Sequence, residues 1–198
     1  MVDYEIAVIG GGIVGCAVFD KLVLNGIKTV LIEKGEDVSL GATKANSGIV
    51  HAGYDCVPRT LKAELNVKGN LMYEKMTKRL GEKITKCGSL VVCKREDLSG
   101  LEELRDRGIL NGINNLRIVE KEELKKMEPN LSEDICYGLY APSAKIVSPY
   151  NICIALYTFV HLQTCAEIHI EMLLVYRHVV KSDRYSKIMR ILPVFLQP

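Results

Sequence analysis

The fold is decided by residues 4–34, which read YEIAVIGGGIVGCAVFDKLVLNGIKTVLIEK. Residues 4–9 have the length and apolar character of a strand, and they lead directly into GGGIVG at residues 10–15. A helical pattern of apolar residues follows and ends at Gly26, and a second apolar run then ends on Glu33. Strand, glycine turn, helix, strand and acid, in this order, predict a βαβ unit of the dinucleotide-binding type.

Each glycine of the pattern has its own expected task. Gly10 permits a tight turn, Gly12 leaves room for a pyrophosphate against the backbone, and Gly15 lets the helix pack closely on the sheet. The helix N-terminus offers unpaired amides and a partial positive charge to a phosphate. Glu33 can accept hydrogen bonds from ribose hydroxyls, and its charge disfavours a 2′-phosphate. The alternative is a tight turn with a solvated acid, but the complete pattern favours an adenine dinucleotide site.

The segment at residues 39–54 reads SLGATKANSGIVHAGY and is rich in glycine and hydroxyl residues. Bare backbone at its glycines can approach a flat ligand closely. Thr43, Asn46 and Ser47 supply donors for phosphate or ring oxygens. Composition alone slightly favours the alternative, a solvated loop. The apolar residues 49–52 nevertheless predict that the segment folds back against the core.

His51 is the only histidine before residue 161. A single histidine is structural more often than catalytic. Its place just beyond the expected phosphate loop favours a catalytic role, because an imidazole titrates near neutral pH and can take a proton from a substrate hydroxyl as hydride leaves.

Residues 60–80 have the apolar spacing of an amphipathic helix that ends at Gly81. The residues expected to form its buried stripe recur at three- and four-residue steps: Leu61, Leu65, Gly69, Met72, Met76 and Leu80. The two methionines are therefore expected to pack in the core.

Further elements alternate along the rest of the chain. Strands are predicted at residues 86–93, 116–119 and 136–140, and helices at 97–110, at 121–127 and from Ser148-Pro149 onward. The predicted fold is α/β, with an FAD/NAD(P)-binding Rossmann-like part at residues 1–82 and the start of an α+β substrate domain at residues 83–156.

Composition narrows the possible partners and compartment. The chain has 198 residues, 48% hydrophobic and 25% charged, with a formal net charge of +2, which does not indicate a nucleic-acid partner. Seven cysteines without a C-x-x-C pair indicate neither a metal site nor a dithiol couple. A first strand near residue 4 leaves no room for a signal peptide, and no apolar run approaches the roughly 20 residues of a membrane span. We therefore expect a reduced, cytoplasmic protein.

These motifs together resemble a known family. VIGGGIVG with the following Glu33-Lys34, and GATKANSGIVHAGYD at residues 41–55, are similar to the D-amino-acid-oxidase-like superfamily of FAD enzymes. LKAELNVKGN, KCGSLVV and GLYAPSAKIVSPY, between residues 61 and 150, most resemble FAD-dependent glycerol-3-phosphate dehydrogenases of the anaerobic type. The related L-2-hydroxyglutarate dehydrogenases are the second alternative.

The resemblance implies a site and a reaction. Gly10, Gly12 and Gly15 would hold the FAD pyrophosphate, Glu33 the adenosine ribose, and His51 would lie near the isoalloxazine ring. The family oxidises a secondary alcohol, such as glycerol 3-phosphate, by hydride transfer to flavin N5 and passes the electrons to an acceptor other than NAD. The sequence does not identify this electron acceptor. The residues expected along the phosphates and flavin are Lys34, Thr43, Asn46, Ser47 and Gly48.

Two features depart from the family. Arg59 stands where a glycine usually follows Pro58, and residues 157–198 no longer follow the family pattern. This atypical tail is interpreted as a truncated or frame-shifted end, with a divergent but genuine segment as the alternative. The FAD domain is then incomplete and the chain is expected to be inactive by itself. Three hypotheses remain: a dehydrogenase by ancestry, a non-catalytic nucleotide-binding fragment, and an unstable remnant.

Overall fold

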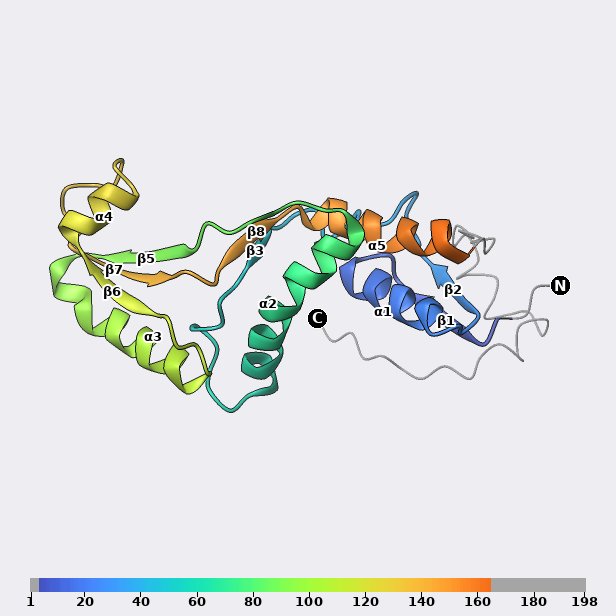
Figure 1. The fold of residues 1–198 in the computed structure, drawn as a ribbon, viewed down its shortest axis with the longest axis horizontal. Coiled ribbons are helices and arrows are strands. Elements are labelled where there is room, and N and C mark those ends of the chain that lie inside the picture. Colours follow the sequence, from blue (N-terminus) through green and yellow to red (C-terminus); the bar gives the residue numbers. More distant parts are fainter. Residues whose placement is uncertain (1–3, 165–198) are drawn as a thin grey trace. The chain divides into compact units, whose positions relative to one another are not determined.

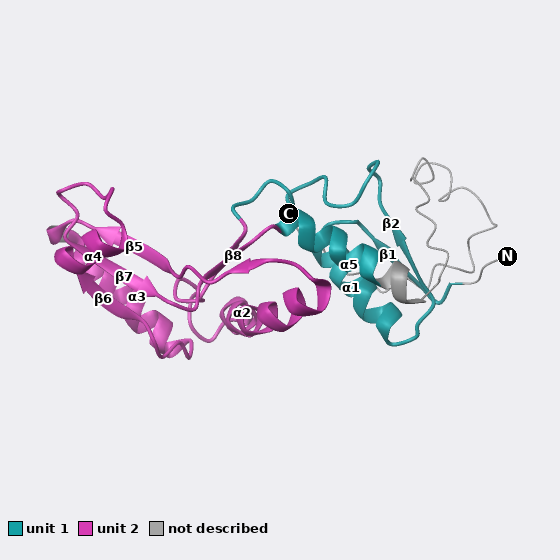
Figure 2. Ribbon diagram, turned by 45° about the horizontal axis from the view of Figure 1, so that its top comes forward, with its two compact units in different colours: residues 1–47, 149–198 teal, residues 48–148 magenta. Residues whose placement is uncertain are grey.

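The chain forms two compact units in a computed structural model that describes residues 4–164. Unit 1 is drawn from residues 1–47 and 149–198, and unit 2 is the continuous segment 48–148 (Figure 2). The boundary predicted between residues 82 and 83 falls inside unit 2. The reason is that strand β3 (Ile49–Val50) pairs with β8 (Lys145–Val147), which ties the two ends of the segment together.

Unit 1 contains the predicted βαβ order. Strands β1 (Ile6–Ile9) and β2 (Thr29–Ile32) are parallel neighbours, and helix α1 (Ile13–Leu24) connects them (Figure 1). Helix α5 (Pro149–Thr164) packs on α1. Fully buried side chains from both helices meet in this core: Cys16, Phe19, Ile152, Cys153 and Leu156.

The start predicted for the atypical tail, Tyr157, lies inside α5. Its ring stacks on Phe19 of α1 with centroids 6.4 Å apart. The first part of the tail therefore continues a helix that covers the core of unit 1. The remaining residues, 165–198, lie outside the described part of the chain.

Unit 2 is built on two antiparallel sheets of three strands. The first has the order β3-β8-β4, where β4 spans Ile84–Thr85. The second has the order β5-β7-β6, formed by Ser89–Cys93, Tyr137–Ala141 and Arg117–Glu120. A short 3-10 turn, η1 (Arg95–Asp97), leads into α3 (Leu98–Leu110), and α3 and α4 (Lys121–Met127) pack on the second sheet. Most of these elements lie where the sequence predicts them, whereas the short strands β3, β4 and β8 were not expected.

Helix α2 (Leu61–Leu80) has the predicted limits. Thr60 caps its start by accepting a hydrogen bond from the Ala63 amide at 3.2 Å, and Gly81 ends it in the left-handed conformation. The turn before it places Arg59 at φ +64°, which explains why a glycine suits this position. Arg59 thus does not prevent the helix from starting.

The prediction of the buried face of α2 is wrong. Leu61, Leu65 and Met72 are 67%, 56% and 68% exposed, so the first of the two methionines is not a core residue. The residues that α2 buries are instead Ala63, Asn70 and Thr77, spaced seven apart. A buried polar network around Asn70 is the physical reason, because its amide must face the partners described below.

The helices within residues 4–164 are all too short or too polar to cross a lipid bilayer.

Candidate functional site

The glycine loop of unit 1 connects β1 to α1. Gly10 adopts φ +104°, and its amide donates to the carbonyl of Ile32 on β2 at 2.7 Å. A Cβ placed on Gly15 would lie 1.8 Å from the carbonyl oxygen of Gly10, which no real side chain can do. This contact agrees with the packing role predicted for Gly15: only glycine allows α1 to start so close to the strand.

The outer face of the loop is open. A Cβ on Gly10 would meet no described atom within 4 Å, and one on Gly12 would approach Thr43 Oγ1 at 3.3 Å. Gly12 is also the N-cap of α1, so the amides of the first helical turn begin beside this opening. Bare backbone at a helix N-terminus is the geometry that accepts a pyrophosphate.

Thr43 is positioned against this helix end. Its buried hydroxyl accepts a hydrogen bond from the Ile13 amide at 3.0 Å. The Asn46 side chain donates to the carbonyls of Ala42 at 3.1 Å and Thr43 at 2.7 Å, which closes the loop on itself. The structure therefore brings Thr43 and Asn46 together with the glycine loop. The other two residues of unit 1 predicted here, Lys34 and Ser47, have exposed side chains.

Glu33 ends β2 and faces the same loop. Its carboxylate accepts hydrogen bonds from the amide of Gly11 and, at 2.9 Å, from that of Gly35. Partial burial opposes ionisation of this carboxyl, but hydrogen bonds from the Gly11, Gly35 and Lys34 amides and the Lys34 charge outweigh it and lower the pKa of Glu33. The Glu33 carboxylate is thus held ionised at the edge of the loop, and an ionised carboxylate can accept hydrogen bonds from hydroxyl groups such as those of a ribose.

Two buried cysteines, Cys16 and Cys153, lie behind the loop, and their contact was not predicted from the sequence. The thiols of Cys16 on α1 and Cys153 on α5 are 3.5 Å apart, and they approach the Gly11 carbonyl at 3.4 and 3.5 Å. The hydrogen bond that its thiol shares with Cys153, together with burial, raises the pKa of Cys16, so this thiol stays protonated. Across residues 4–164 there is no group of three or more His, Cys, Asp or Glu side chains arranged to hold a metal ion.

The last two predicted site residues belong to unit 2. Gly48 adopts φ +68°, and its carbonyl oxygen accepts a hydrogen bond from the amide of Val147 at 2.9 Å. His51 directly follows β3 and has an exposed side chain. Its main-chain carbonyl accepts a hydrogen bond from the buried side chain of Asn70 at 2.9 Å. Asn70 and its partner Lys145 were not predicted, because the apolar spacing of α2 points to another face and nothing in the sequence marks Asn70 as buried.

The parallel β1–α1–β2 unit, the open glycine loop and the acid at the end of β2 define a dinucleotide-binding fold. A family model described as FAD dependent oxidoreductase, abbreviated DAO, matches residues 5–167. The chain belongs to this family, whose description supports FAD as the cofactor.

Individual relatives agree with this membership. Glycerol 3-phosphate dehydrogenase of Caloramator mitchellensis is 42% identical over 154 residues, which are 77% of this chain and 32% of the relative. The mitochondrial L-2-hydroxyglutarate dehydrogenase of Pongo abelii is 34% identical over 142 residues, which are 70% and 33% of the two chains. The solved structure of dithionite-reduced L-alpha-glycerophosphate oxidase from Mycoplasma pneumoniae with FAD bound matches with a TM-score of 0.78 and 31% identity, and the match covers 82% of this chain and 43% of that one.

The chain thus spans about a third of the length of the curated relatives that it matches. It covers less than half of the solved FAD-bound structure, so the FAD-binding domain is incomplete in it. The family match also extends past residue 156, where the sequence pattern predicted its end.

Proposed function

We propose that this chain is part of an FAD-dependent dehydrogenase that oxidises a secondary alcohol, with glycerol 3-phosphate as the substrate. The observation that carries this proposal is the glycine loop whose amides donate to Glu33 and Thr43, in a chain 42% identical to a glycerol 3-phosphate dehydrogenase. Bound FAD supplies the acceptor for the hydride that leaves the alcohol carbon.

The residues of unit 1 would hold the cofactor. Gly10, Gly12 and the first turn of α1 present bare backbone and amides to the pyrophosphate. Glu33 accepts the ribose hydroxyls and, through its charge, disfavours a 2′-phosphate. Lys34, Thr43, Asn46, Ser47 and Gly48 are assigned to the phosphates and flavin.

His51 is assigned the role of the base that accepts the proton of the substrate hydroxyl. An imidazole nitrogen of His51 takes the proton of the substrate hydroxyl, which makes the carbon a better hydride donor. Its exposed side chain supports this role, because a base must reach the substrate. In the chain completed to full length, we expect His51→Ala to slow flavin reduction by roughly 100-fold while FAD stays bound. An unchanged reduction rate would return His51 to a structural role.

The visible absorption of the purified chain shows whether it binds flavin, and reduction of that flavin is tested in the chain completed to full length. A flavin spectrum that bleaches when glycerol 3-phosphate is added without oxygen supports the proposal. Bleaching by L-2-hydroxyglutarate alone favours the second candidate, to which the 34% identical relative points. A stable flavin spectrum that neither compound bleaches indicates a non-catalytic nucleotide-binding fragment, and absence of flavin contradicts the assigned cofactor site.

Two glycine variants test whether the glycine loop is the site that binds flavin. Gly12→Val places a branched side chain at the opening of the loop and should abolish flavin binding. Gly69→Val adds the same side chain to α2, where a Cβ meets no described atom within 4 Å, and should leave binding intact. Equal flavin affinity in the two variants would mean that the loop is not the cofactor site.

A further inference from the structure

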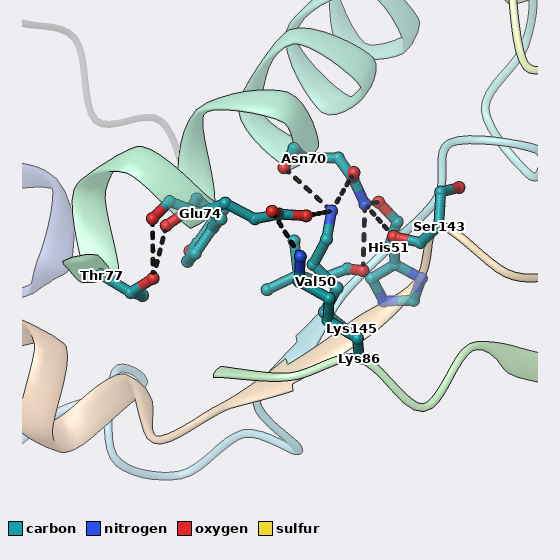
Figure 3. A network of polar contacts seen from close by, with 9 residues as sticks. Val50, His51, Asn70, Glu74, Thr77, Lys86, Ser143 and Lys145 are labelled. Atoms are coloured by element: carbon teal, nitrogen blue, oxygen red, sulfur yellow. Dashed lines mark hydrogen bonds and ion pairs between the residues drawn. The ribbon is translucent and has the colours of Figure 1, made fainter. Parts of the chain in front are cut away.

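Unit 2 buries a lysine and an asparagine against each other. Asn70 lies in the middle of α2 and is 4% exposed, and Lys145 lies on β8 and is 6% exposed (Figure 3). Lys145 is opposite Val50 in the pairing of β8 with β3. Lysine is almost never buried without a partner, because the transfer of its charge from water is costly. The network around it therefore has to be accounted for.

Lys145 sets the orientation of the Asn70 amide. Its ammonium donates to Asn70 Oδ1 at 2.7 Å, with the Asn70 main-chain oxygen at 3.4 Å and Glu74 Oε1 at 3.5 Å. A lysine can only donate hydrogen bonds, so it selects the oxygen end of the amide. The NH₂ end of Asn70 must then point away from Lys145.

That NH₂ end holds the main chain at His51. Asn70 Nδ2 donates to the carbonyls of His51 and Ser143, each at 2.9 Å, and lies 3.4 Å from that of Val50. The imidazole of His51 has no hydrogen bond to the part of the chain that the structure describes. The placement of the ring therefore depends on its main chain, and Figure 3 shows Asn70 clamping that main chain from α2.

We infer that Lys145 and Asn70 are positioning residues for His51. Lys145 fixes the amide of Asn70, and Asn70 fixes the carbonyl of His51, which aims the imidazole at the substrate hydroxyl. This inference rests on the proposed function of His51 as the base. The competing role is purely structural, in which the same contacts only fasten α2 to the β3-β8 ladder.

Two lysines that share one carboxylate provide matched variants. Lys86 also pairs with Glu74, through Oε2 at 2.6 Å, but its side chain is 60% exposed. Lys145→Met keeps roughly the length of the side chain and removes the hydrogen-bond donor to Asn70. Lys86→Met removes only the exposed ion pair with Glu74. Asn70→Asp is the second test variant. It keeps the side-chain shape and the pairing with Lys145, but it loses the NH₂ group that holds His51, so it separates loss of the clamp from failure to fold.

The first readout is NMR of the 198-residue chain. We expect the carbonyl ¹³C of His51 to shift and its imidazole signals to broaden or double in Lys145→Met and in Asn70→Asp. Both signals should stay at their wild-type positions in Lys86→Met. Unchanged His51 signals in both test variants would overturn the inference, whatever the activity of the chain.

The second readout is anaerobic reduction of bound FAD by glycerol 3-phosphate in the chain completed to full length, because the 198-residue chain is expected to be inactive by itself. A misplaced catalytic group can lose roughly 100-fold in rate. We expect a loss of roughly 10- to 100-fold in both test variants, with FAD affinity and substrate affinity unchanged, and no loss in Lys86→Met. A fall in rate that merely parallels a fall in FAD affinity and in thermal midpoint would make the contacts structural only. Failure of the chain completed to full length to reduce its flavin with glycerol 3-phosphate would refute the proposed function, while the NMR result on the 198-residue chain would still decide whether the clamp positions His51.

Discussion

Replacing Gly15 with alanine should separate α1 from β1. The added Cβ would lie 1.8 Å from the Gly10 carbonyl oxygen and 3.0 Å from its carbon, so the helix must move by about 1.6 Å to reach the 3.4 Å of an ordinary contact with that oxygen. Overpacking of this kind costs about 1–3 kcal/mol, and we expect about 3 kcal/mol because the obstacle is backbone. Alanine recovers about 1 kcal/mol of helix propensity, which leaves a net loss of about 2 kcal/mol.

Urea unfolding followed by circular dichroism measures this loss. With a slope of about 2 kcal/mol per molar urea, the transition that includes α1 should move about 1 M lower. Gly69→Ala in α2 is the control, because no described atom lies within 4 Å of its Cβ position, and it should move its transition about 0.5 M higher. A Gly15→Ala chain as stable as the wild type would refute the close approach of α1 to the strand.

Three further predictions use the same unfolding measurement. Arg59→Gly removes a side chain from a residue at φ +64° and should stabilise the chain by about 1 kcal/mol; a loss would exclude the left-handed turn. Glu33→Gln should cost stability at pH 7 but progressively less below the ordinary carboxyl pKa of about 4.3, because a carboxyl with a lowered folded-state pKa loses its contribution as it becomes protonated; a gap independent of pH would contradict the assigned amide contacts. Tyr157→Ala removes the ring stacked on Phe19 and should cost about 2 kcal/mol, whereas an unchanged midpoint would place the end of α5 outside the core.

The local part of the site was predictable from the sequence. The glycine loop, α1 and Glu33 lie within one continuous segment. The glycines of the turn are needed for its backbone conformation and close packing, and both requirements can be inferred from the residue type alone. Thr43 was predicted because its hydroxyl lies in a segment rich in glycine and hydroxyl residues, next to the expected phosphate. Its contact with the Ile13 amide supports that prediction, although its role toward the cofactor stays a prediction.

The non-local part was not predictable. Strands of two or three residues, such as β3 and β8, have no periodicity of their own and exist only because they pair with each other. The apolar spacing in α2 indicated the wrong buried face, because one paired polar residue, Asn70, outweighs the pattern of leucines and methionines once Lys145 is opposite it. Hydrophobic periodicity cannot anticipate a partner that is 75 residues away in the sequence.

The division of unit 1 into two segments has a consequence for synthesis on the ribosome. Cys16 and Cys153 touch across the α1–α5 contact although 137 residues separate them. At roughly 5–20 residues per second, α5 is made on the order of 10 s after α1. During that time the face of α1 that carries Cys16 and Phe19 has no helix to cover it, while the continuous unit 2 can already close. The glycine loop is therefore translated before unit 2 but is backed by α5 only after unit 2 has been made.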